Sequence, residues 1–439
     1  MSKTLIYQML PRLWGEGRMS SVDDATLDYL HGLGISHLWC TGIIRHSTGQ
    51  PFVKGDAGSP YAISDYYDIN PYLADVPSRR ISEFRSLVGR VHSHGLKLII
   101  DFVPNHVGCD YSDRHGGIPL CGWHDYDWTD TIKIDYSAPG TWEAMYNIVR
   151  FWASKGVDGF RCDMVELVPP EFMGWLIARI KEEFPGVIFI AEVYQKERYR
   201  QYIDEVKFDF LYDKSGLYDV LRDIVAGHGT ARAITWNWQF LQDLQPHMLN
   251  FLENHDEQRL ASPWFAGTPE YYAALCASLL LNTAPYMLYF GQETGVDASE
   301  GHEGRTSIFN FARPESLQRL SAYVHGQGSL PAEESAVLAR YRAALQLAAA
   351  PSVSEGLTFD LCYCQSAEDG FDPDRHFAFL RHSGGETMLF CCNFSDSEAH
   401  LRIRIPDHAV DYLRIGTNPH PDGIPITVPP RDFISVNAQ

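Results

Sequence analysis

The segment Gly156-Val-Asp-Gly-Phe-Arg161-Cys-Asp163 has the pattern of a short apolar strand that ends in charged residues. Side chains of a strand alternate between its two faces, so we expect Arg161 and Asp163 to point the same way and Cys162 the other way. A guanidinium beside a carboxylate favours the ionised carboxylate. An ionised Asp163 at the end of a strand is suited to act as a nucleophile.

A second acid lies at the end of the next apolar run, Phe189-Ile-Ala-Glu192-Val193. Cleavage of a glycosidic bond uses two carboxyl groups of different character, one ionised and one protonated. Each acid taken alone is more typical of a helix N-cap or a surface ion pair. The interpretation therefore depends on how the rest of the chain is organised.

Short apolar runs alternate with helical patterns, such as Ala25–Leu33, over the first 350 residues. The predicted strands are Leu5–Met9, His37–Trp39, Leu96–Phe102, Val157–Cys162, Val187–Val193, Phe208–Tyr212, Leu249–Leu252 and Tyr286–Phe290. Eight strand–helix units predict an α/β fold with a closed (β/α)₈ barrel. The alternative, an open doubly wound sheet, needs a glycine-rich phosphate loop after its first strand. Pro11-Arg-Leu-Trp14 is not such a loop.

Two segments interrupt this alternation. Residues 106–136 are rich in Gly, Asp, His and Trp without a helical period, and we interpret them as a small domain inserted after the third strand. Residues 351–439 show period-two runs separated by turn residues, which predicts a C-terminal antiparallel β-sandwich. Residues 1–105 and 137–350 are then the barrel.

Composition limits the partners and the compartment. The net charge of −20 opposes binding to phosphate backbones, so nucleic acid is not an expected partner. The nine cysteines are an odd number without regular spacing, which favours reduced thiols over disulfides or a metal site. No apolar run reaches the roughly 18 residues of a membrane span, and the N-terminus lacks a signal-peptide pattern. We therefore expect a cytoplasmic protein that has no membrane partner.

The active site of a (β/α)₈ barrel lies where the strands end. The polar residues predicted at those ends are Asp101, Asn105, His106, Arg161, Asp163, Glu192, Asn254, His255 and Asp256. Carboxylates, histidines and an arginine are thus expected to converge on one rim. Five tryptophans in predicted loops near that rim could stack on sugars: Trp123, Trp128, Trp236, Trp238 and Trp264.

With these motifs in order, the chain resembles the α-amylase family, glycoside hydrolase family 13. The four family motifs correspond to Asp101–His106, Gly156–Asp163, Glu192 and Phe251–Asp256, and further matches are Ser59–Tyr66, Ile132–Asp135 and Tyr289–Glu293. The resemblance extends over the whole chain, including an inserted B domain and a C-terminal β domain. It implies a retaining glycoside hydrolase.

The resemblance also implies roles for individual residues. Asp163 corresponds to the nucleophile, Glu192 to the general acid/base, and Asp256 to a third carboxylate that binds sugar hydroxyls. The residues expected to bind substrate are Tyr61, His106, Arg161 and His255, and those expected to support the site are Asp101 and Asn105. No cofactor is required by this chemistry.

Many members of that family hold a structural calcium ion. Asn105 and Asp135 match two of its ligands, but the position of a third, a histidine, is Leu167 in this chain. Calcium takes about 6–8 oxygen ligands, so the sequence predicts at most an incomplete calcium site.

The resemblance implies hydrolysis of α-1,4 bonds in starch-type or maltodextrin α-glucans. One alternative keeps the same residues but passes the glycosyl group to a sugar, as a transglycosylase or glucosyl isomerase does. A second alternative is a non-catalytic relative, such as the amylase-like subunit of an amino-acid transporter, which lacks the carboxylates that this chain has. The preference for α-1,4 or α-1,6 bonds, endo or exo action, chain length and oligomeric state have no signature in the sequence.

Overall fold

The computed structural model describes residues 3–48, 53–112, 117–418 and 420–438, and its centre is a closed parallel barrel. The barrel strands are β1 (Leu5–Met9), β2 (His37–Cys40), β5 (Lys97–Phe102), β8 (Gly159–Cys162), β9 (Ile188–Ala191), β10 (Phe210–Tyr212), β11 (Met248–Phe251) and β12 (Tyr286–Tyr289). All eight predicted strands are confirmed, within two residues at each end. The barrel closes where β1 pairs with both β12 and β2.

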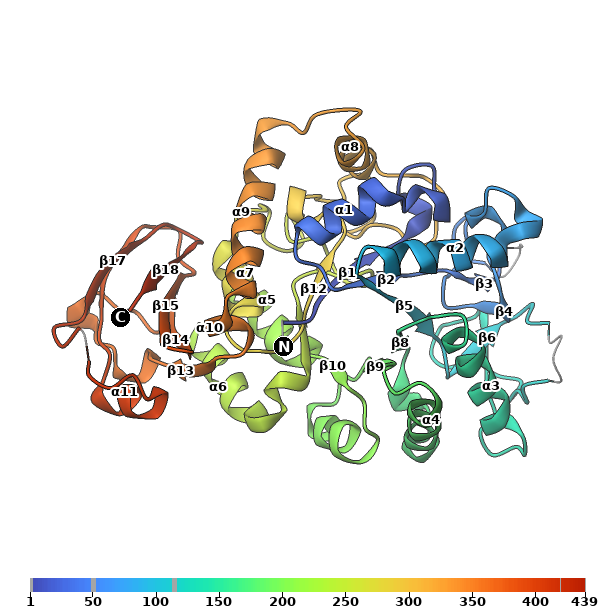
Figure 1. The fold of residues 1–439 in the computed structure, drawn as a ribbon, viewed down its shortest axis with the longest axis horizontal. Helices are drawn as coiled ribbons and strands as arrows, with labels where there is room; N and C mark the ends of the chain where they lie inside the picture. Colours follow the sequence, from blue (N-terminus) through green and yellow to red (C-terminus); the bar gives the residue numbers. More distant parts are fainter. Residues whose placement is uncertain (1–2, 49–52, 113–116, 419, 439) are drawn as a thin grey trace.

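Helices surround the barrel (Figure 1). They are α1 (Asp24–Gly32), α2 (Arg80–Ser93), α3 (Thr141–Ala153), α4 (Pro170–Glu183), α5 (Asp219–Val225), α6 (Arg232–Leu241), α7 (Tyr272–Leu279), α8 (Glu315–Val324) and α9 (Ala332–Ala349). The short α10 (Pro351–Ser354) packs on α9 and on strands of the C-terminal segment. In α2 the buried residues Phe84, Leu87, Val88 and Val91 form one stripe at helical spacing. Such a stripe is the face that a helix packs on a sheet.

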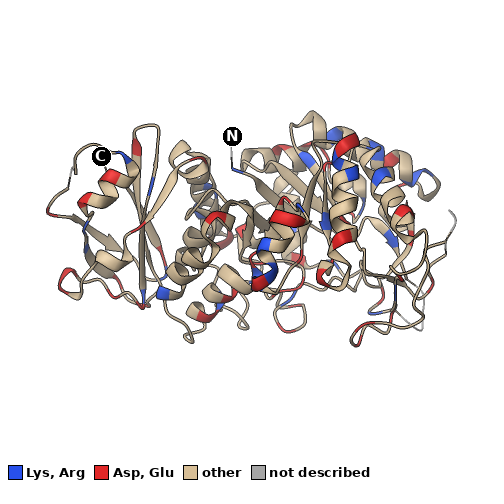
Figure 2. Cartoon of the chain, turned by 90° about the horizontal axis from the view of Figure 1, so that it is seen from below, with Lys and Arg blue, Asp and Glu red and all other residues tan. Residues whose placement is uncertain are grey.

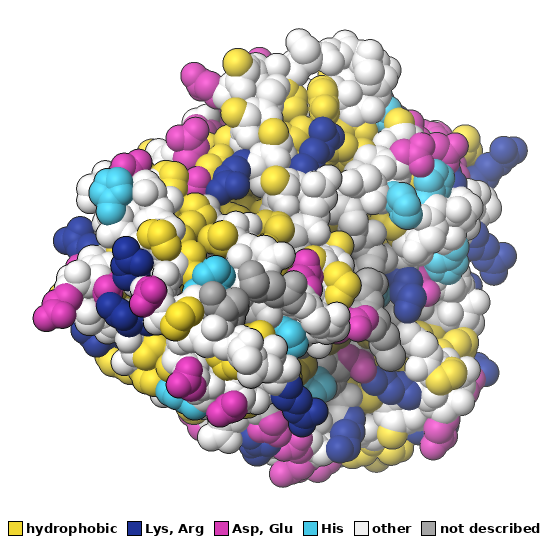
Figure 3. Space-filling view, turned by 60° about the vertical axis from the view of Figure 1, so that its left-hand side comes forward, with side chains coloured by type: hydrophobic (Ala, Val, Ile, Leu, Met, Phe, Trp, Pro, Cys, Tyr) yellow, Lys and Arg dark blue, Asp and Glu magenta, His cyan; other side chains and the backbone are white. Residues whose placement is uncertain are grey.

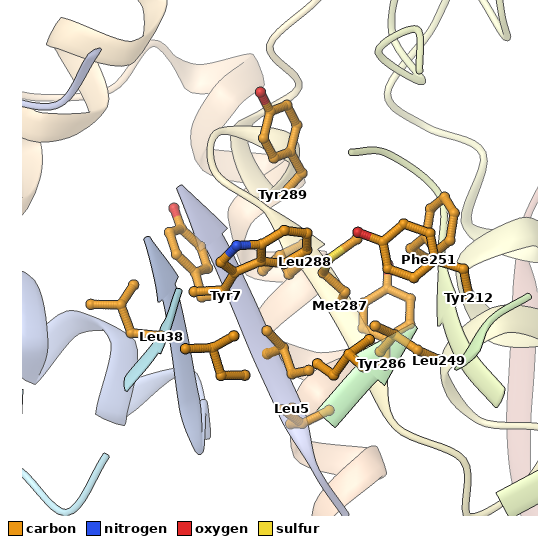
Figure 4. Close-up of a cluster of buried hydrophobic side chains, with 14 of the residues drawn as sticks. Leu5, Tyr7, Leu38, Tyr212, Leu249, Phe251, Tyr286, Met287, Leu288 and Tyr289 are labelled. Carbon is orange, nitrogen blue, oxygen red and sulfur yellow. The ribbon is translucent and has the colours of Figure 1, made fainter. Parts of the chain in front are cut away.

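The barrel interior is packed with large side chains. Figure 4 shows Met287 of β12 near Leu249 and Phe251 of β11. All three side chains are buried and lie on the inner face of the barrel. Because such an interior is filled, it is a packed core and not a pore, and a ligand site is expected where the strands end.

Two small antiparallel sheets lie in the loops at those ends. β6 (His106–Gly108) pairs with β7 (Thr131–Lys133) inside the predicted inserted segment. β3 (Ile44–His46) pairs with β4 (Ile63–Ile69), a region for which the sequence predicted only a long loop. β4 escaped the prediction because it is buried on both faces and therefore lacks alternation of apolar and polar residues.

The C-terminal segment forms the predicted antiparallel β-sandwich. One sheet contains β13 (Leu357–Asp360), β14 (His376–Ser383), β15 (Glu386–Asn393) and β18 (Phe433–Asn437), and the other contains β16 (Ala399–Ile403) and β17 (Ile424–Val428). On β14, Ala378 and Leu380 face the core between the sheets, while Phe377 and Phe379 join the barrel core. The period-two runs predicted as strands, His376–Arg381, Thr387–Phe394, Leu401–Ile405 and Asp432–Val436, correspond to β14, β15, β16 and β18. Strands β13 and β17 and helix α11 (Asp407–Leu413) were not predicted. The exact domain boundaries stay predictions.

Charged residues of both signs are distributed along the helices (Figure 2), and charged side chains of both signs are spread over the face shown in Figure 3. Within the described ranges, no helix is long and apolar enough to cross a membrane.

Candidate active site

A cavity of about 490 Å³ opens at the carboxyl ends of the barrel strands. Five of the predicted site residues line it together: Tyr61, His106, Asp163, Glu192 and Asp256. They come from separate segments of the chain, and the closed barrel brings them to one rim. Aromatic side chains of the inserted segment, Tyr126 and Trp128, form part of the wall.

Strand register places the two central acids next to each other. β8 pairs with β5 so that Arg161 lies opposite Asp101, and with β9 so that Cys162 lies opposite Ala191. The hydrogen-bond ladder continues one residue further, because the Glu192 amide donates to the carbonyl of Cys162 at 3.2 Å. Asp163 and Glu192 therefore follow the ends of the adjacent strands β8 and β9 and lie at nearly the same height along the barrel axis.

Arg161 lies between these acids and is fully buried. Its Nη1 is 2.7 Å from Oδ1 of Asp163, and its Nη2 is 2.9 Å from Oε2 of Glu192. The structure thus differs from the sequence prediction, which gave Arg161 to Asp163 alone. Because one guanidinium serves both carboxylates, it draws them to the same point of the rim and offsets part of the cost of burying two acids.

Glu192 has two further hydrogen-bond donors. The hydroxyl of Tyr194 donates to Oε1 at 2.6 Å, and the amide of Met164 donates to Oε2 at 2.9 Å. Met164 adopts a left-handed backbone conformation with φ of 45°, which is unusual for a residue other than glycine and aims its amide into the site. Burial raises the pKa of Glu192 against the influence of Arg161, and the nearby charge of Asp163 raises it further. A raised pKa suits a carboxyl group that must carry a proton.

Asp163 and Asp256 differ in their surroundings. Burial raises the pKa of Asp163, while Arg161 acts to lower it. For Asp256 burial alone would raise the pKa, but His255 and Arg161 bring it to about 2. Nε2 of His255 lies 3.0 Å from the Asp256 carboxylate, which is 41% exposed. Asp256 is therefore ionised and partly open to solvent at neutral pH.

Tyr61 and His255 form a stacked pair, with ring centroids 5.2 Å apart. The Tyr61 hydroxyl contacts Nε2 of His255 and donates to Asp101 at 3.3 Å. Asp101 also accepts from the indole nitrogen of Trp39 at 3.2 Å. Asp101 thus joins β2 and the segment before β4 to the end of β5, and its support role stays a prediction.

His106 faces the same cavity, with its ring centroid 5.3 Å from that of Trp128. Burial lowers the pKa of His106 to about 4. The imidazole is therefore neutral at physiological pH, and it can donate a hydrogen bond to a sugar hydroxyl without adding charge to the site.

The residues predicted for calcium do not fit that ion. The Asp135 carboxylate accepts from the amide and hydroxyl of Ser137, at 2.9 and 2.6 Å. The Asn105 amide nitrogen donates to Asp125, and the ammonium of Lys133 lies 2.8 Å from that carboxylate. Of the two residues predicted as ligands, Asn105 alone has a buried side-chain oxygen without a partner, Oδ1. One oxygen beside an ammonium is a poor donor set for a hard cation.

Across the part of the chain that the structure describes, no group of three or more His, Cys, Asp or Glu side chains could hold a metal ion. The positive charge beside Asn105 and Asp125 is the ammonium group of Lys133. We infer that Lys133 holds the inserted segment through Asp125 and Asn105, next to His106.

Several residues of the site were missed by sequence reasoning. Tyr194 lies two positions after Glu192, and the alternation that linked Arg161 to Asp163 could have found it. Gln8 of β1, whose amide nitrogen is 2.7 Å from Nδ1 of His255, carried no signal, because the contact joins residues far apart in the chain. Two tryptophans predicted in loops, Trp236 and Trp238, lie in α6 instead.

The fold agrees with a family comparison. A sequence model of the alpha-amylase catalytic domain matches residues 15–126 and 123–327. The match covers well over half of the chain, so the protein belongs to the alpha-amylase family.

Individual relatives are distant. The alpha-1,4-glucan:maltose-1-phosphate maltosyltransferase of Cereibacter sphaeroides is 28% identical over 256 residues, which are 50% of this chain and 37% of that protein. Alpha-amylase 3 of Dictyoglomus thermophilum is 22% identical over 346 residues, 68% of this chain and 65% of that protein. The chain thus spans less than two thirds of the length of these relatives.

A solved structure matches over nearly the full length. The noncanonic maltogenic alpha-amylase AmyB of Thermotoga neapolitana superposes with a TM-score of 0.71 at 23% identity, covering 99% of this chain and 97% of that one. At this identity the likeness shows the shared fold.

Proposed function

We propose that this protein is a retaining α-glycosidase that hydrolyses α-1,4-glucosidic bonds of starch-type α-glucans or maltodextrins. The observation that carries the proposal is the shared guanidinium of Arg161, which holds Asp163 and Glu192 at the ends of adjacent strands. A double displacement requires two carboxyl groups that lie near each other, one as nucleophile and one as acid/base.

In the first step, an oxygen of Asp163 attacks the anomeric carbon, and the bond from that carbon to the leaving oxygen breaks. Glu192 gives its proton to the leaving oxygen. As Glu192 becomes an anion, the Tyr194 hydroxyl and the Met164 amide are already in place to stabilise the new charge. Asp256 is ionised and can accept hydrogen bonds from hydroxyls of the same sugar.

In the second step, Glu192 takes a proton from water, and the water oxygen attacks the anomeric carbon of the ester to Asp163. The bond to Asp163 breaks, the carboxylate is restored, and Glu192 is again protonated. Two inversions at the anomeric carbon retain its configuration.

The surroundings of the site favour a neutral, chain-like sugar. Tyr61, Tyr126 and Trp128 offer aromatic faces to the cavity, which suits the apolar faces of sugar rings. The amylase and maltosyltransferase relatives act on α-glucans by their names, which supports this substrate class.

A direct test uses maltoheptaose with the wild type and with Asp163→Asn. We expect shorter products that are released in the α configuration. Chromatography measures their length, and NMR of the new anomeric centre measures their configuration. Asp163→Asn should lose roughly 10³-fold or more in kcat with an unchanged fold. Near-normal activity of this variant, or products in the β configuration, would rule out the mechanism.

Glycosyl transfer is the second candidate, and the similarity to a maltosyltransferase favours it specifically. Both reactions share the first step and differ in the group that attacks the ester to Asp163. Products longer than maltoheptaose in the same assay would assign the protein to transfer.

A further inference from the structure

A second hollow of about 420 Å³ lies outside the catalytic cavity, between α6, α5 and the turn that follows β9. It is lined by Lys196, Glu197, Val220, Ala233, Trp236, Asn237 and Phe240. Helices α5 and α6 lie beside each other in Figure 1. None of these residues takes part in the mechanism above.

Its floor carries two large aromatic side chains that solvent reaches. Trp236 is 62% exposed and Phe240 is 49% exposed. They are four residues apart on α6, so they lie one above the other on the same helix face, roughly 5–6 Å apart at Cβ. The opposite face of α6 packs inward through Ile234 and Leu241. Folding of the helix therefore does not need the two outer rings.

Polar groups border the rings. The Lys196 ammonium lies 4.7 Å from the centre of the Phe240 ring and donates to Oδ1 of Asn237 at 3.1 Å. Asn237 in turn donates to Asp213, the residue that follows β10, at 3.2 Å. This chain of hydrogen bonds fixes α6 to the carboxyl end of the barrel, where the catalytic acids also lie.

Residues only two positions apart in the chain line the hollow and the catalytic cavity. Tyr194 lines the catalytic cavity and Lys196 lines the hollow. Two residues span at most about 7 Å of chain. A ligand that extends out of the catalytic cavity past Tyr194 therefore meets the aromatic rings of α6 after a short distance.

We propose that Trp236 and Phe240 bind distal sugar rings of a long α-glucan whose scissile bond lies between Asp163 and Glu192. The proposal rests on the proposed function and adds a preference for long chains. Stacked aromatic faces with a few polar groups at the margin fit a neutral polymer of sugar rings. A net charge of −20 disfavours an acidic partner, and the short chain distance between Tyr194 of the cavity and Lys196 of the hollow favours the substrate over a separate protein.

The test compares kcat/KM on amylose with kcat/KM on p-nitrophenyl α-maltoside, a substrate too short to reach α6. We expect Trp236→Ala to lower kcat/KM on amylose roughly tenfold, the loss expected for one aromatic stacking contact. On the short substrate the change should stay within about twofold. Trp236→Phe should keep most of the activity on amylose, and Phe240→Ala should act like Trp236→Ala.

Tyr412→Ala is the matched control, because Tyr412 is an aromatic residue of similar exposure, 54%, on the C-terminal helix α11. It should leave both substrates unaffected. Retention of each protein on an amylose-containing gel gives an independent measure of binding. Equal kinetics and equal retention of wild type and Trp236→Ala would overturn the inference.

Light scattering tests whether a second copy of this chain, instead of substrate, covers Trp236 and Phe240, because it measures the oligomeric state. A dimer that Trp236→Ala converts to a monomer, with both substrates affected alike, would also overturn the inference. Failure of the proposed function gives a different result, since the wild type would then turn over no α-glucan of any length.

Discussion

The hydroxyl of Tyr194 donates a 2.6 Å hydrogen bond to the carboxylate of Glu192, the residue that we propose as general acid. Such a bond favours the ionised form of the acid and so works against the burial that raises its pKa. Burial and the Tyr194 hydrogen bond therefore act in opposite directions on Glu192. Burial favours the protonated form that begins the reaction, and the hydrogen bond stabilises the anion once the proton has left.

Substitution of Tyr194 by Phe should change the pH dependence of the reaction. Without the phenolic donor the pKa of Glu192 rises further, so the protonated acid persists to higher pH. We expect the alkaline limb of the kcat/KM profile to move upward in pH, while the acid limb, which reflects ionisation of Asp163, keeps its position. An unmoved alkaline limb would show that the hydrogen bond does not tune the acid.

Glu192→Gln should separate proton donation from nucleophilic attack. On maltoheptaose we expect a loss of about 10²–10⁴-fold, the usual contribution of general acid catalysis. α-Maltosyl fluoride needs no proton to release fluoride, so formation of the glycosyl-enzyme, measured as a burst of fluoride, should be nearly normal. Asp163→Asn serves as the control and should lose activity on both substrates. Equal losses of Glu192→Gln on both would contradict the assignment.

The ammonium of Lys133 should neutralise Asp125 and hold the inserted segment, so that no metal ion is needed there. We expect EDTA to leave the melting temperature and activity of the wild type unchanged, because the ammonium already neutralises Asp125. Lys133→Met should reduce stability by about 1–3 kcal/mol, the cost of an unpaired, partly buried polar group. A melting temperature that rises with added calcium would contradict this interpretation.

The same pair gives a pH dependence of stability. Lys133 and Asn105 hold the pKa of Asp125 below its ordinary value, although burial opposes them. The stabilisation is thus complete above the unfolded pKa of about 3.9 and is lost as pH falls through the lower folded pKa. Lys133→Met should lose less stability than the wild type over this acidic window, measured by urea unfolding.

Gly159→Ala should destabilise the barrel wall. A Cβ atom at this position of β8 would lie 2.7 Å from Cγ1 of Ile188 and 3.1 Å from Cγ1 of Ile99. Overpacking of this kind costs about 1–3 kcal/mol. Gly95→Ala is not a fair control, because its φ is positive, whereas Gly89, in helix α2, has open space around it. Gly89→Ala should leave the melting temperature unchanged or raise it.

The barrel could be predicted because its strands are buried along most of their length. Apolar runs such as Leu98-Ile-Ile100 mark parallel strands, and the charged residues that follow them, here Asp101, mark the rim. Strand β4 could not be predicted, since Ser64, Asp65 and Asp68 are buried by hydrogen bonds and ion pairs that join distant segments. Burial of polar residues leaves no hydrophobic period in the sequence.

The acids of the site were predictable as motifs, but their partners were not. Arg161 was assigned to Asp163 from its spacing of two residues, whereas its contact with Glu192 depends on the pairing of β8 with β9. Lys133 and Asp125 meet only because the inserted segment folds back on itself. The roles assigned to these residues stay predictions until the variants above are measured.

Closure of the barrel links catalysis to the last step of folding. Leu5 pairs with Tyr286 across almost the whole catalytic segment, and Gln8 of the first strand supports His255 near its end. Contacts between residues so distant in the chain form late, because the loop between them must first be closed. During refolding, the helical circular dichroism signal should therefore recover before glucan cleavage does. The rate at which activity returns would then report the rate at which β1 pairs with β12.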